Sequence, residues 1–427
     1  MDSAPIVCEL NRVIAAHEDL PREVLVKSDL LRLGLAFAPE TIPLLAAAKQ
    51  KSYFIFSFDR IPRAEMDALM KQVIPEEIAL VGGPWNFTRV IVSVRYNPAS
   101  PYRVMYRDDR LWLTLGDERI CEVRTEPPPA YYEKTLANGK PAIDIAPSIE
   151  WGYLIYLTAF RLCQYWGDKE ECRFCDINTN YRQQKQEGRP YTGMKSLGEI
   201  VEAMGIIAGT DSVARAYTVT GGSVLDQLDG QDEAGFYARY AAAIEEKFPG
   251  RWIAKAVVQA LPLSQVRQLK AAGYQIYHPN YEVWDARLFA WLCPGKERYI
   301  GRAEWHRRIC DAAEVFGPSH VIPNFVAGIE MAQPHGFTSI DDAIASTTEG
   351  LEFFMAHGIC PRFTVWCVEP GTGLTACAPA PLAYYARLLT AYREAHRRYC
   401  LPVPPGYGEP GLGKAVFSVS PFMDVLP

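Results

Sequence analysis

Three cysteines within residues 161–177, RLCQYWGDKEECRFCDI, are the side chains best suited to chemistry. Cys163, Cys172 and Cys175 follow a CX8CX2C spacing. Thiolates are soft metal ligands, and a CxxC pair lets two sulfurs reach one metal centre from a tight turn. Gly167 and Asp168 lie in the middle of the long gap and favour the chain reversal that would bring Cys163 to the other two.

The number of ligands separates two kinds of metal site. A structural zinc site needs a fourth Cys or His at a matching spacing, and the sequence downstream offers no second CxxC and no HxxxH. A [4Fe–4S] cluster held by three cysteines leaves one iron open to a substrate or cofactor. We therefore favour the cluster, with a zinc loop or unliganded thiols as the alternative.

Short apolar runs alternate with amphipathic helices from about residue 150 onward, which is typical of βα units that build a parallel sheet. Helix starts are indicated by Ser196 with Glu199 and by Ser339 with Asp342. The cysteines follow the first expected strand, and loops after such strands carry function in parallel barrels. The expected strands cover 153–160, 216–220, 252–258, 274–280, 319–328 and 362–370.

The first 145 residues have a different texture, with β-branched and aromatic runs separated by turn-rich pieces. These runs cover 53–58, 89–96, 102–107, 110–115 and 120–124. A proline-rich connector follows. The sequence thus predicts a mixed, β-rich N-terminal module over 1–145, a second domain over 146–400 and a Pro/Gly-rich C-terminal tail over 401–427 that either seals the second domain or merely packs against it.

Composition excludes several classes of protein. The 44 Lys and Arg residues against 50 Asp and Glu give a net charge of −6 without a basic stripe, so we expect no nucleic-acid partner. No basic region precedes an apolar core at the N-terminus, and no apolar run reaches the length of a membrane span. We expect a cytoplasmic protein without membrane contact, in which the 11 cysteines form no disulfide framework.

Further motifs after later strands resemble the radical S-adenosylmethionine superfamily, in particular its biotin-synthase-like branch. There, a three-cysteine cluster lies on the loop after the first strand. The first gap is eight residues here instead of the usual three, whereas the second gap and Phe174 match. The resemblance implies an α/β fold with a partial (β/α)6 TIM-like barrel, and a [4Fe–4S] cluster on Cys163, Cys172 and Cys175.

The resemblance also implies residues that contact S-adenosylmethionine. Gly221 and Gly222 match a glycine motif that contacts the methionine amino group, where bare backbone can approach a ligand closely; a plain turn is the alternative. Three later segments match in the same order along the chain: GYQIYHPNYEVWD in the region of the fourth strand, FVAGIE at the end of the fifth strand and VEPGTGL at the sixth. The cofactor contacts so implied are Phe174, Asn280, Glu282, Gly328, Glu330, Pro370 and Gly371.

The implied activity is reductive cleavage of S-adenosylmethionine to a 5′-deoxyadenosyl radical that modifies a small molecule by rearrangement, C–C cleavage or insertion. Flavodoxin or ferredoxin would donate the electron. Without a cobalamin motif, a small metabolite is favoured, and Tyr165, Trp166 and Trp284 are candidate pocket walls. The alternatives are a radical methyl- or sulfur-transferase and a non-catalytic zinc or iron–sulfur protein.

Cys367 is a candidate catalytic residue because it lies beside the sixth-strand motif. It would serve as a thiyl intermediate, a hydrogen donor or a sulfur ligand, and a buried structural cysteine is the alternative. An auxiliary cluster on Cys360, Cys367, Cys377 and Cys400 is a weaker hypothesis, since no CxxC pair anchors it.

Overall fold

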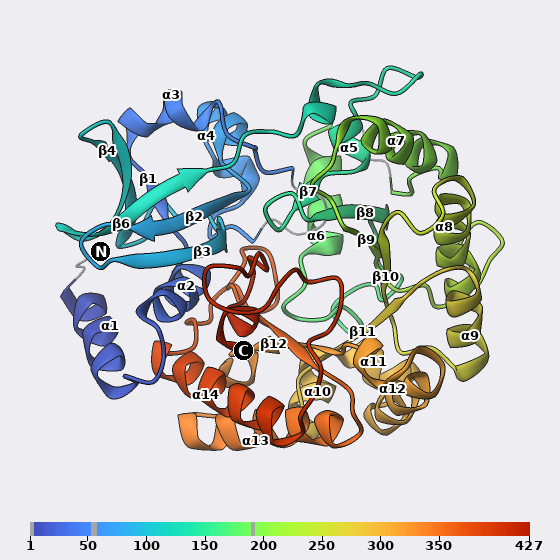
Figure 1. Cartoon of the computed structure of the whole chain (residues 1–427). Coiled ribbons are helices and arrows are strands. Elements are labelled where there is room, and N and C mark those ends of the chain that lie inside the picture. The colour runs from blue at the N-terminus through green and yellow to red at the C-terminus, as the bar shows by residue number, and fades with distance from the viewer. Residues whose placement is uncertain (1–3, 53–57, 189–192) are drawn as a thin grey trace.

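Two β-sheets organise the protein, and helices surround them (Figure 1). The computed structural model describes residues 4–52, 58–188 and 193–427. Within these residues, the larger sheet has the order β13-β12-β11-β10-β9-β8-β7. Its parallel strands are β8 (Leu154–Phe160), β9 (Ala216–Gly221), β10 (Ile253–Val258), β11 (Ile276–Glu282), β12 (Asn324–Ala327) and β13 (Arg362–Val365).

Each of these strands pairs with the next one along the chain, and the sheet does not close on itself. A short strand, β7 (Ser148–Ile149), pairs antiparallel with β8 at one edge. The predicted partial (β/α)6 TIM-like barrel is therefore confirmed. Strand β12 is shorter than its predicted run, because Pro323, which has no N–H to donate, separates it from an isolated parallel bridge between Val321 and Tyr277.

Helices connect the strands and cover the outside of the barrel (Figure 1). Both predicted N-caps are present: Ser196 Oγ accepts from Glu199 N at 3.2 Å, and Ser339 Oγ accepts from Asp342 N at 3.3 Å. The helices are α6 (Ile177–Gln186), α7 (Leu197–Thr210), α8 (Glu233–Lys247), α9 (Leu263–Ala271), α10 (Ala286–Leu292), α11 (Pro294–Tyr299), α12 (Arg302–Phe316), α13 (Ile340–Ala356) and α14 (Leu382–Arg398).

Trp284 does not form the pocket wall proposed for it. Its ring stacks on His306 at a centroid distance of 4.7 Å and packs beneath helix α13, where Gly350 leaves room for it. His306 Nε2 also lies 2.6 Å from the Tyr281 hydroxyl. Both rings thus belong to an aromatic cluster between β11, α12 and α13 rather than to a pocket or to solvent.

The N-terminal sheet is mixed, as predicted, because β1 pairs parallel with β4 and the remaining pairs are antiparallel. The predicted run 53–58 lies outside the described residues except for Phe58, and the run at 77–82 was missed. The domain boundaries themselves stay predictions. The strands are β1 (Ala36–Phe37), β2 (Glu77–Gly82), β3 (Phe87–Ser93), β4 (Tyr102–Arg107), β5 (Arg110–Leu115) and β6 (Glu118–Thr125), with helices α1 (Ala4–Ala16), α2 (Arg22–Leu33), α3 (Ile42–Leu45), α4 (Ala68–Val73) and α5 (Ala142–Ile145).

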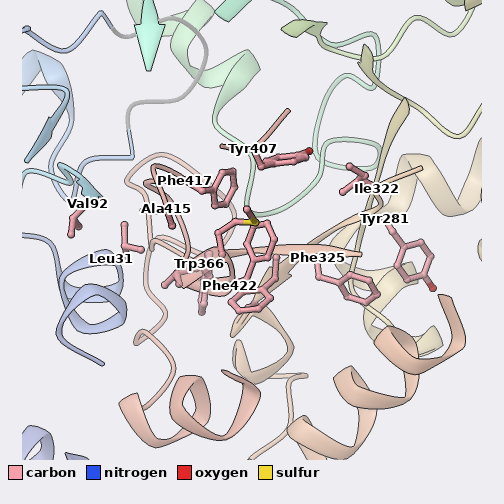
Figure 2. Packing of buried hydrophobic residues seen from close by; sticks show 14 of the residues in the cluster. Leu31, Val92, Tyr281, Ile322, Phe325, Trp366, Tyr407, Ala415, Phe417 and Phe422 are labelled. Carbon is pink, nitrogen blue, oxygen red and sulfur yellow. The ribbon is translucent and has the colours of Figure 1, made fainter. Parts of the chain in front are cut away.

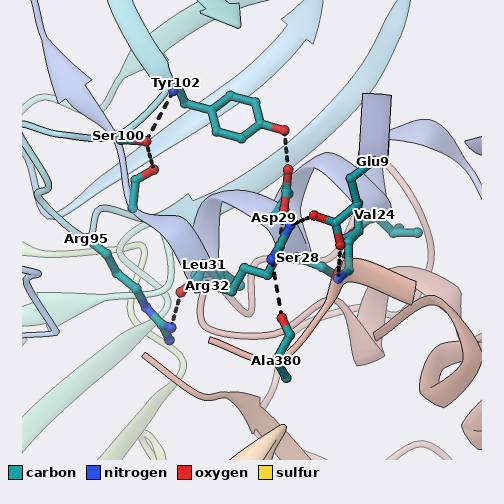
Figure 3. A network of polar contacts seen from close by, with 12 residues as sticks. Glu9, Val24, Ser28, Asp29, Leu31, Arg32, Arg95, Ser100, Tyr102 and Ala380 are labelled. Carbon is teal, nitrogen blue, oxygen red and sulfur yellow. Dashed lines mark hydrogen bonds and ion pairs between the residues drawn. The ribbon is translucent and has the colours of Figure 1, made fainter. Parts of the chain in front are cut away.

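A buried polar network joins this N-terminal part to the barrel (Figure 3). Asp29 of α2 accepts from the Tyr102 hydroxyl and from Arg32 Nε, each at 2.5 Å. Arg95, after β3, donates to the carbonyl of Leu31 and, at 2.8 Å, to that of Val365 at the end of β13. These bonds fix the last barrel strand against α2.

The C-terminal segment lies between the two sheets (Figure 1). Ser93 of β3 donates its N–H to Ser418 O at 3.0 Å, and Val365 of β13 donates to Val419 O at 3.2 Å. Phe417 and Phe422 pack together at a ring distance of 5.0 Å beside Trp366 (Figure 2). The segment therefore fills the open side of the barrel.

No helix in the described ranges is both long and apolar enough to cross a membrane.

We expect the buried ion pair of Lys27 and Asp424 to anchor the C-terminal segment to helix α2. The two charges lie 2.7 Å apart and are fully buried, and Lys27 also donates to Phe417 O at 2.6 Å. Lys27→Met should lower the free energy of unfolding by about 3–5 kcal/mol, because it strands a buried carboxylate. Urea denaturation measures the loss. Arg110→Gln, which breaks the exposed pair with Glu122, should cost less than about 1 kcal/mol. Equal effects of the two variants would contradict the anchor.

Candidate active site

A cavity of about 240 Å³ extends from the C-terminal ends of the barrel strands down between the strands. Phe58, Phe417 and Val419 line it from outside the barrel. The tail therefore closes part of the cavity wall, in agreement with the sealing role considered for it. The predicted site residues found in the lining are Cys163, Cys172, Phe174, Cys175, Gly221, Gly222, Asn280, Glu282 and Cys367.

Asn178, buried at the start of α6, organises the cysteine loop. Its Oδ1 accepts from Cys163 N at 2.9 Å, and its Nδ2 donates to Tyr165 O at 2.9 Å and to Cys163 O at 3.2 Å. One amide side chain thus satisfies the backbone on both sides of Cys163 and also ties it to the helix that follows Cys175. The sequence pattern gave no sign of this residue.

The long gap between Cys163 and Cys172 is an ordered loop with contacts on two sides. Gln164 Oε1 accepts from Leu225 N at 2.6 Å, beyond strand β9. Glu170 O accepts from Gly295 N at 3.1 Å, in helix α11. Glu171 forms a bidentate ion pair with Arg182, whose Nη1 and Nη2 donate to the two carboxylate oxygens at 2.8 and 2.9 Å. The extra residues therefore connect the cysteines to the β9 and β11 ends of the barrel.

Gly222 allows the cysteine loop to pack on the end of β9. A Cβ at this position would lie 1.8 Å from Leu162 O and 2.5 Å from Cys163 Cα. A Cβ at Gly221 would meet Phe160 O at 2.3 Å. The glycine pair is thus required by the chain's own packing, which is a physical reason additional to the close approach of a cofactor.

Cys293, at the start of α11, lies beside Cys172 and was not expected from the sequence. Its hydrogen bond lowers the pKa of Cys172, and Lys296 lowers that pKa further, although burial opposes both effects. Burial raises the pKa of Cys163 to about 12, and it raises that of Cys175 well above its usual value. Metal binding would have to offset this burial, because thiolates are the ligands.

The three cysteines supply the soft thiolate donors that an iron–sulfur cluster binds, and all three line one cavity. Within the described residues, no three His, Cys, Asp or Glu side chains converge on one point as metal ligands. Cysteines of an iron–sulfur cluster bind different irons, so their sulfurs can stand further apart around one cavity.

Glu282 and Lys296 form a buried ion pair beside the cysteines. Lys296 Nζ lies 2.6 Å from Glu282 Oε1 and donates to Asn280 O at 2.7 Å. Glu282 has a φ of 86° at a β-bulge, a strained conformation that clusters at functional sites. Burial disfavours the charge on Lys296, but Glu282 and then Cys172 raise its pKa overall. Lys296 therefore stays charged at the edge of the cavity.

Asn280 presents an unused acceptor in the same wall. In the parts of the chain that the structure describes, its Oδ1 is buried and has no hydrogen-bond partner. Buried amide oxygens without partners are rare. Asn280 therefore has capacity to accept from a bound molecule.

Gly328 and Glu330 follow β12 directly and are outside the cavity lining. A Cβ at Gly328 would meet the Tyr385 hydroxyl at 2.4 Å. Glu330 accepts from Gly328 N at 2.8 Å and from the hydroxyls of Thr347 and Tyr384. Their observed contacts brace α13 and α14 against the barrel, and a role toward a cofactor stays a prediction.

Pro370 and Gly371 follow the lining residue Glu369 and are not themselves in the lining. Gly371, with a φ of 76°, accepts from Thr179 Oγ1 at 3.0 Å. The sixth-strand turn thus rests on α6, which carries the cysteine loop. A cofactor contact by these two residues stays a prediction.

Cys367 is buried and lines the cavity, where its Sγ donates to Phe58 O at 3.4 Å. Burial raises its pKa to about 11, so it is a neutral thiol at neutral pH. Cys360 lies instead against Tyr392, Cys377 bonds to Gln333 O, and Cys400 is exposed. These separate environments give the auxiliary-cluster hypothesis no support.

Tyr165 and Trp166, both expected from the sequence to line a pocket, lie in different environments. Tyr165 is buried in the lining and donates its hydroxyl to Gln259. Trp166 is 47% exposed and is not in the lining, because Arg182 and Tyr181 hold its ring on the outer side of the loop. Of these two adjacent residues, only Tyr165 therefore lines the cavity.

Comparison with known proteins gives distant fold similarities. Methylornithine synthase (PylB) has a TM-score of 0.39 at 12% identity, covering 59% of this chain and 72% of that chain. HydG, a maturase of the [FeFe]-hydrogenase, has a TM-score of 0.42 at 13% identity, covering 58% of this chain and 51% of that chain. Coproporphyrinogen III oxidase (HemN) from Escherichia coli, a radical SAM enzyme, has a TM-score of 0.34 at 13% identity, covering 60% of this chain and 53% of that chain. This chain thus spans about half the length of the last two, and likenesses this distant identify neither a family nor a reaction.

No protein-family model and no curated protein matches the chain.

Asn178→Ala should disorder the cysteine loop, because it removes both the acceptor and the donor that hold Cys163. We expect a loss of about 1–3 kcal/mol in the free energy of unfolding for the stranded backbone groups. We also expect a several-fold lower iron content after anaerobic reconstitution. Gln186→Ala, at the exposed end of α6, is the control and should change neither quantity. Unchanged iron content in Asn178→Ala would refute the organising role.

Gly222→Ala should displace the loop, since no rotamer can remove a Cβ that overlaps backbone atoms. Gly198→Ala is the matched control: no atom lies within 4 Å of its Cβ, and alanine favours the surrounding helix α7. Thermal unfolding should show a lower midpoint for Gly222→Ala and an unchanged or higher one for Gly198→Ala. Equal midpoints would mean that the packing on Gly222 is unimportant.

Proposed function

We propose that the protein is a radical S-adenosylmethionine enzyme that modifies a small molecule. In this proposal, Cys163, Cys172 and Cys175 hold a [4Fe–4S] cluster, and S-adenosylmethionine lies in the cavity beside it. The single observation that carries the proposal is that all three cysteines and the Gly221–Gly222 pair line one cavity at the C-terminal ends of parallel strands.

When bound, the cluster supplies the electron that cleaves S-adenosylmethionine to a 5′-deoxyadenosyl radical. The chain positions and encloses these groups. Asn178 holds the loop of Cys163, and Asn280 has an unused acceptor oxygen for a donor on the cofactor. Glu282 and Phe174 line the same space. We assign these three lining residues to cofactor binding.

Water has to be kept from a carbon radical, and the chain has the means to do so. Phe417 and Val419 of the tail line the open side of the barrel, and Phe58 lines the cavity from the N-terminal part. Phe58 N donates to Glu369 Oε1 at 2.5 Å, which fixes this contact. Cys367 lies next to Phe58 and is a candidate hydrogen donor to a substrate radical.

An electron donor such as flavodoxin or ferredoxin would have to approach the cluster from outside. The cysteine loop has an exposed outer side that includes Trp166, Asp168 and Lys169. We assign the docking of the donor to this side, because Cys163 and Cys172 flank the same loop.

Anaerobic reconstitution with iron and sulfide, followed by dithionite and S-adenosylmethionine, tests the proposal. The wild type should release 5′-deoxyadenosine. Cys163→Ala, Cys172→Ala and Cys175→Ala should each reduce this product at least a hundred-fold, since a missing ligand prevents cluster assembly. Cys8→Ala, an exposed cysteine in α1, is the control and should retain wild-type product. Liquid chromatography with mass spectrometry measures the product.

Other outcomes separate the remaining functions. A colourless protein that holds one zinc and no sulfide would contradict the proposal and favour the non-catalytic metal protein. Methylthioadenosine or S-adenosylhomocysteine as the main product would favour a radical sulfur- or methyl-transferase.

A further inference from the structure

The deep part of the cavity, toward the N-terminal ends of the strands, is charged. Its lining includes Glu150 from the β7–β8 turn, Lys255 from β10, His278 from β11 and Arg362 from β13. The inside of a parallel barrel is ordinarily filled by branched apolar side chains. Charged groups buried at such positions are costly unless they have partners. We call these four residues the charged floor.

The charged floor is separate from the cysteine loop. Thr218, which also lines the cavity, pairs with Lys255 across β9 and β10 and lies three residues before Gly221. At the rise of a parallel strand, three residues span about 10 Å. The floor is thus roughly 10 Å below the glycine turn on which the cysteine loop packs.

Several polar atoms of the floor and its surroundings are unused. Within residues 4–52, 58–188 and 193–427, each is buried and lacks a hydrogen-bond partner. Because such atoms are rare in folded proteins, a group of them around one cavity indicates a polar ligand. They are Glu150 Oε2, Thr218 Oγ1, His278 Nδ1, Asn324 Oδ1 and Arg362 Nε.

The tail fixes the two cations of the floor. Lys255 Nζ donates to Gly406 O at 2.8 Å and lies 4.0 Å from the centre of the Tyr407 ring. The Arg362 guanidinium lies 5.1 Å from the Phe417 ring and 5.5 Å from Tyr407. Tyr407 also bonds to His278 Nε2. The floor is therefore a preorganised site, held by the same segment that closes the barrel; Figure 2 shows Tyr407 and Phe417 of this segment.

The charges of the floor do not balance. Glu150 is the carboxylate that faces Lys255 and Arg362, while burial and then Arg362 and Lys255 push the pKa of His278 well below its usual value, so it is neutral. Burial lowers the pKa of Lys255 to about 8 and raises that of Glu150 to about 7. The other lining acids do not compensate the excess positive charge: Glu282 pairs with Lys296, and Glu369 contacts Phe58 at the opposite end.

We propose that the charged floor binds a carboxylate group of the substrate, with Lys255, Arg362 and Thr218 as its donors. That the ligand is the substrate rests on the proposed function. A carboxylate matches the single excess positive charge, whereas a phosphate carries about −1.5 to −2 at neutral pH and would leave uncompensated negative charge beside Glu150. The substrate is therefore a small carboxylic acid whose acid group points away from the cysteine loop.

Acetate, with acetamide as its neutral match, tests the site without S-adenosylmethionine or reductant. Saturation-transfer NMR on the full chain should show acetate binding to the wild type and at least tenfold weaker binding of acetamide. Arg362→Gln and Lys255→Met should each weaken acetate binding at least tenfold. Arg267→Gln and Lys270→Met, exposed on α9, are the matched controls and should bind acetate like the wild type.

Thr218→Val is a second test with a variant that is expected to fold, since it keeps the shape of the side chain and removes only a hydroxyl that has no hydrogen-bond partner. It should keep the wild-type melting midpoint and bind acetate several-fold more weakly. Equal binding of acetate and acetamide, or binding by Arg362→Gln and Lys255→Met within twofold of wild type, would overturn the proposal. Displacement of acetate by tenfold less inorganic phosphate would overturn the choice of carboxylate.

The two proposals fail independently. Acetate binding together with no release of 5′-deoxyadenosine would contradict the proposed function and leave the carboxylate site in place. Release of 5′-deoxyadenosine together with no acetate binding would contradict the carboxylate site alone.

Discussion

The contact between the cysteine loop and Gly222 is the constraint on which the rest of the site depends. The loop leaves β8, and its backbone at Leu162 and Cys163 occupies the space that a side chain after β9 would fill. Asn178 then ties Cys163 to α6. Because these contacts hold the backbone of the loop, packing within the protein itself places Cys163. The long CX8CX2C gap extends the same loop to α11, where Cys293 and Lys296 meet Cys172.

The barrel is incomplete without the two ends of the chain. Arg95 holds the end of β13 against α2, and the tail bridges β3 and β13 through Ser418 and Val419. The same tail contributes Phe417 to the cavity wall and Tyr407 to the charged floor. Closure of the barrel and formation of the deep polar site are therefore one structural event, since both need the tail in place.

The features that could be predicted from the sequence are those that a local residue pattern encodes. Strand periodicity located the six parallel strands, the caps at Ser196 and Ser339 were visible as spacing, and the cysteines and glycines were found as motifs at strand ends. Cys293 and Lys296 were missed because they reach the site through the turn between α10 and α11, about 120 residues from the cysteine loop, and no local spacing marks them. The charged floor left a signal that was overlooked: Lys255 and His278 interrupt runs of apolar residues in buried strands.

Electron paramagnetic resonance of the anaerobically reconstituted, dithionite-reduced protein is the decisive test of a three-cysteine cluster. We expect the signal of a reduced [4Fe–4S] cluster that changes its g-values when S-adenosylmethionine is added, because three cysteines would leave one iron open to bind it. A cluster signal that S-adenosylmethionine leaves unchanged, or one that persists when Cys163, Cys172 and Cys175 are all replaced by alanine, would contradict this expectation.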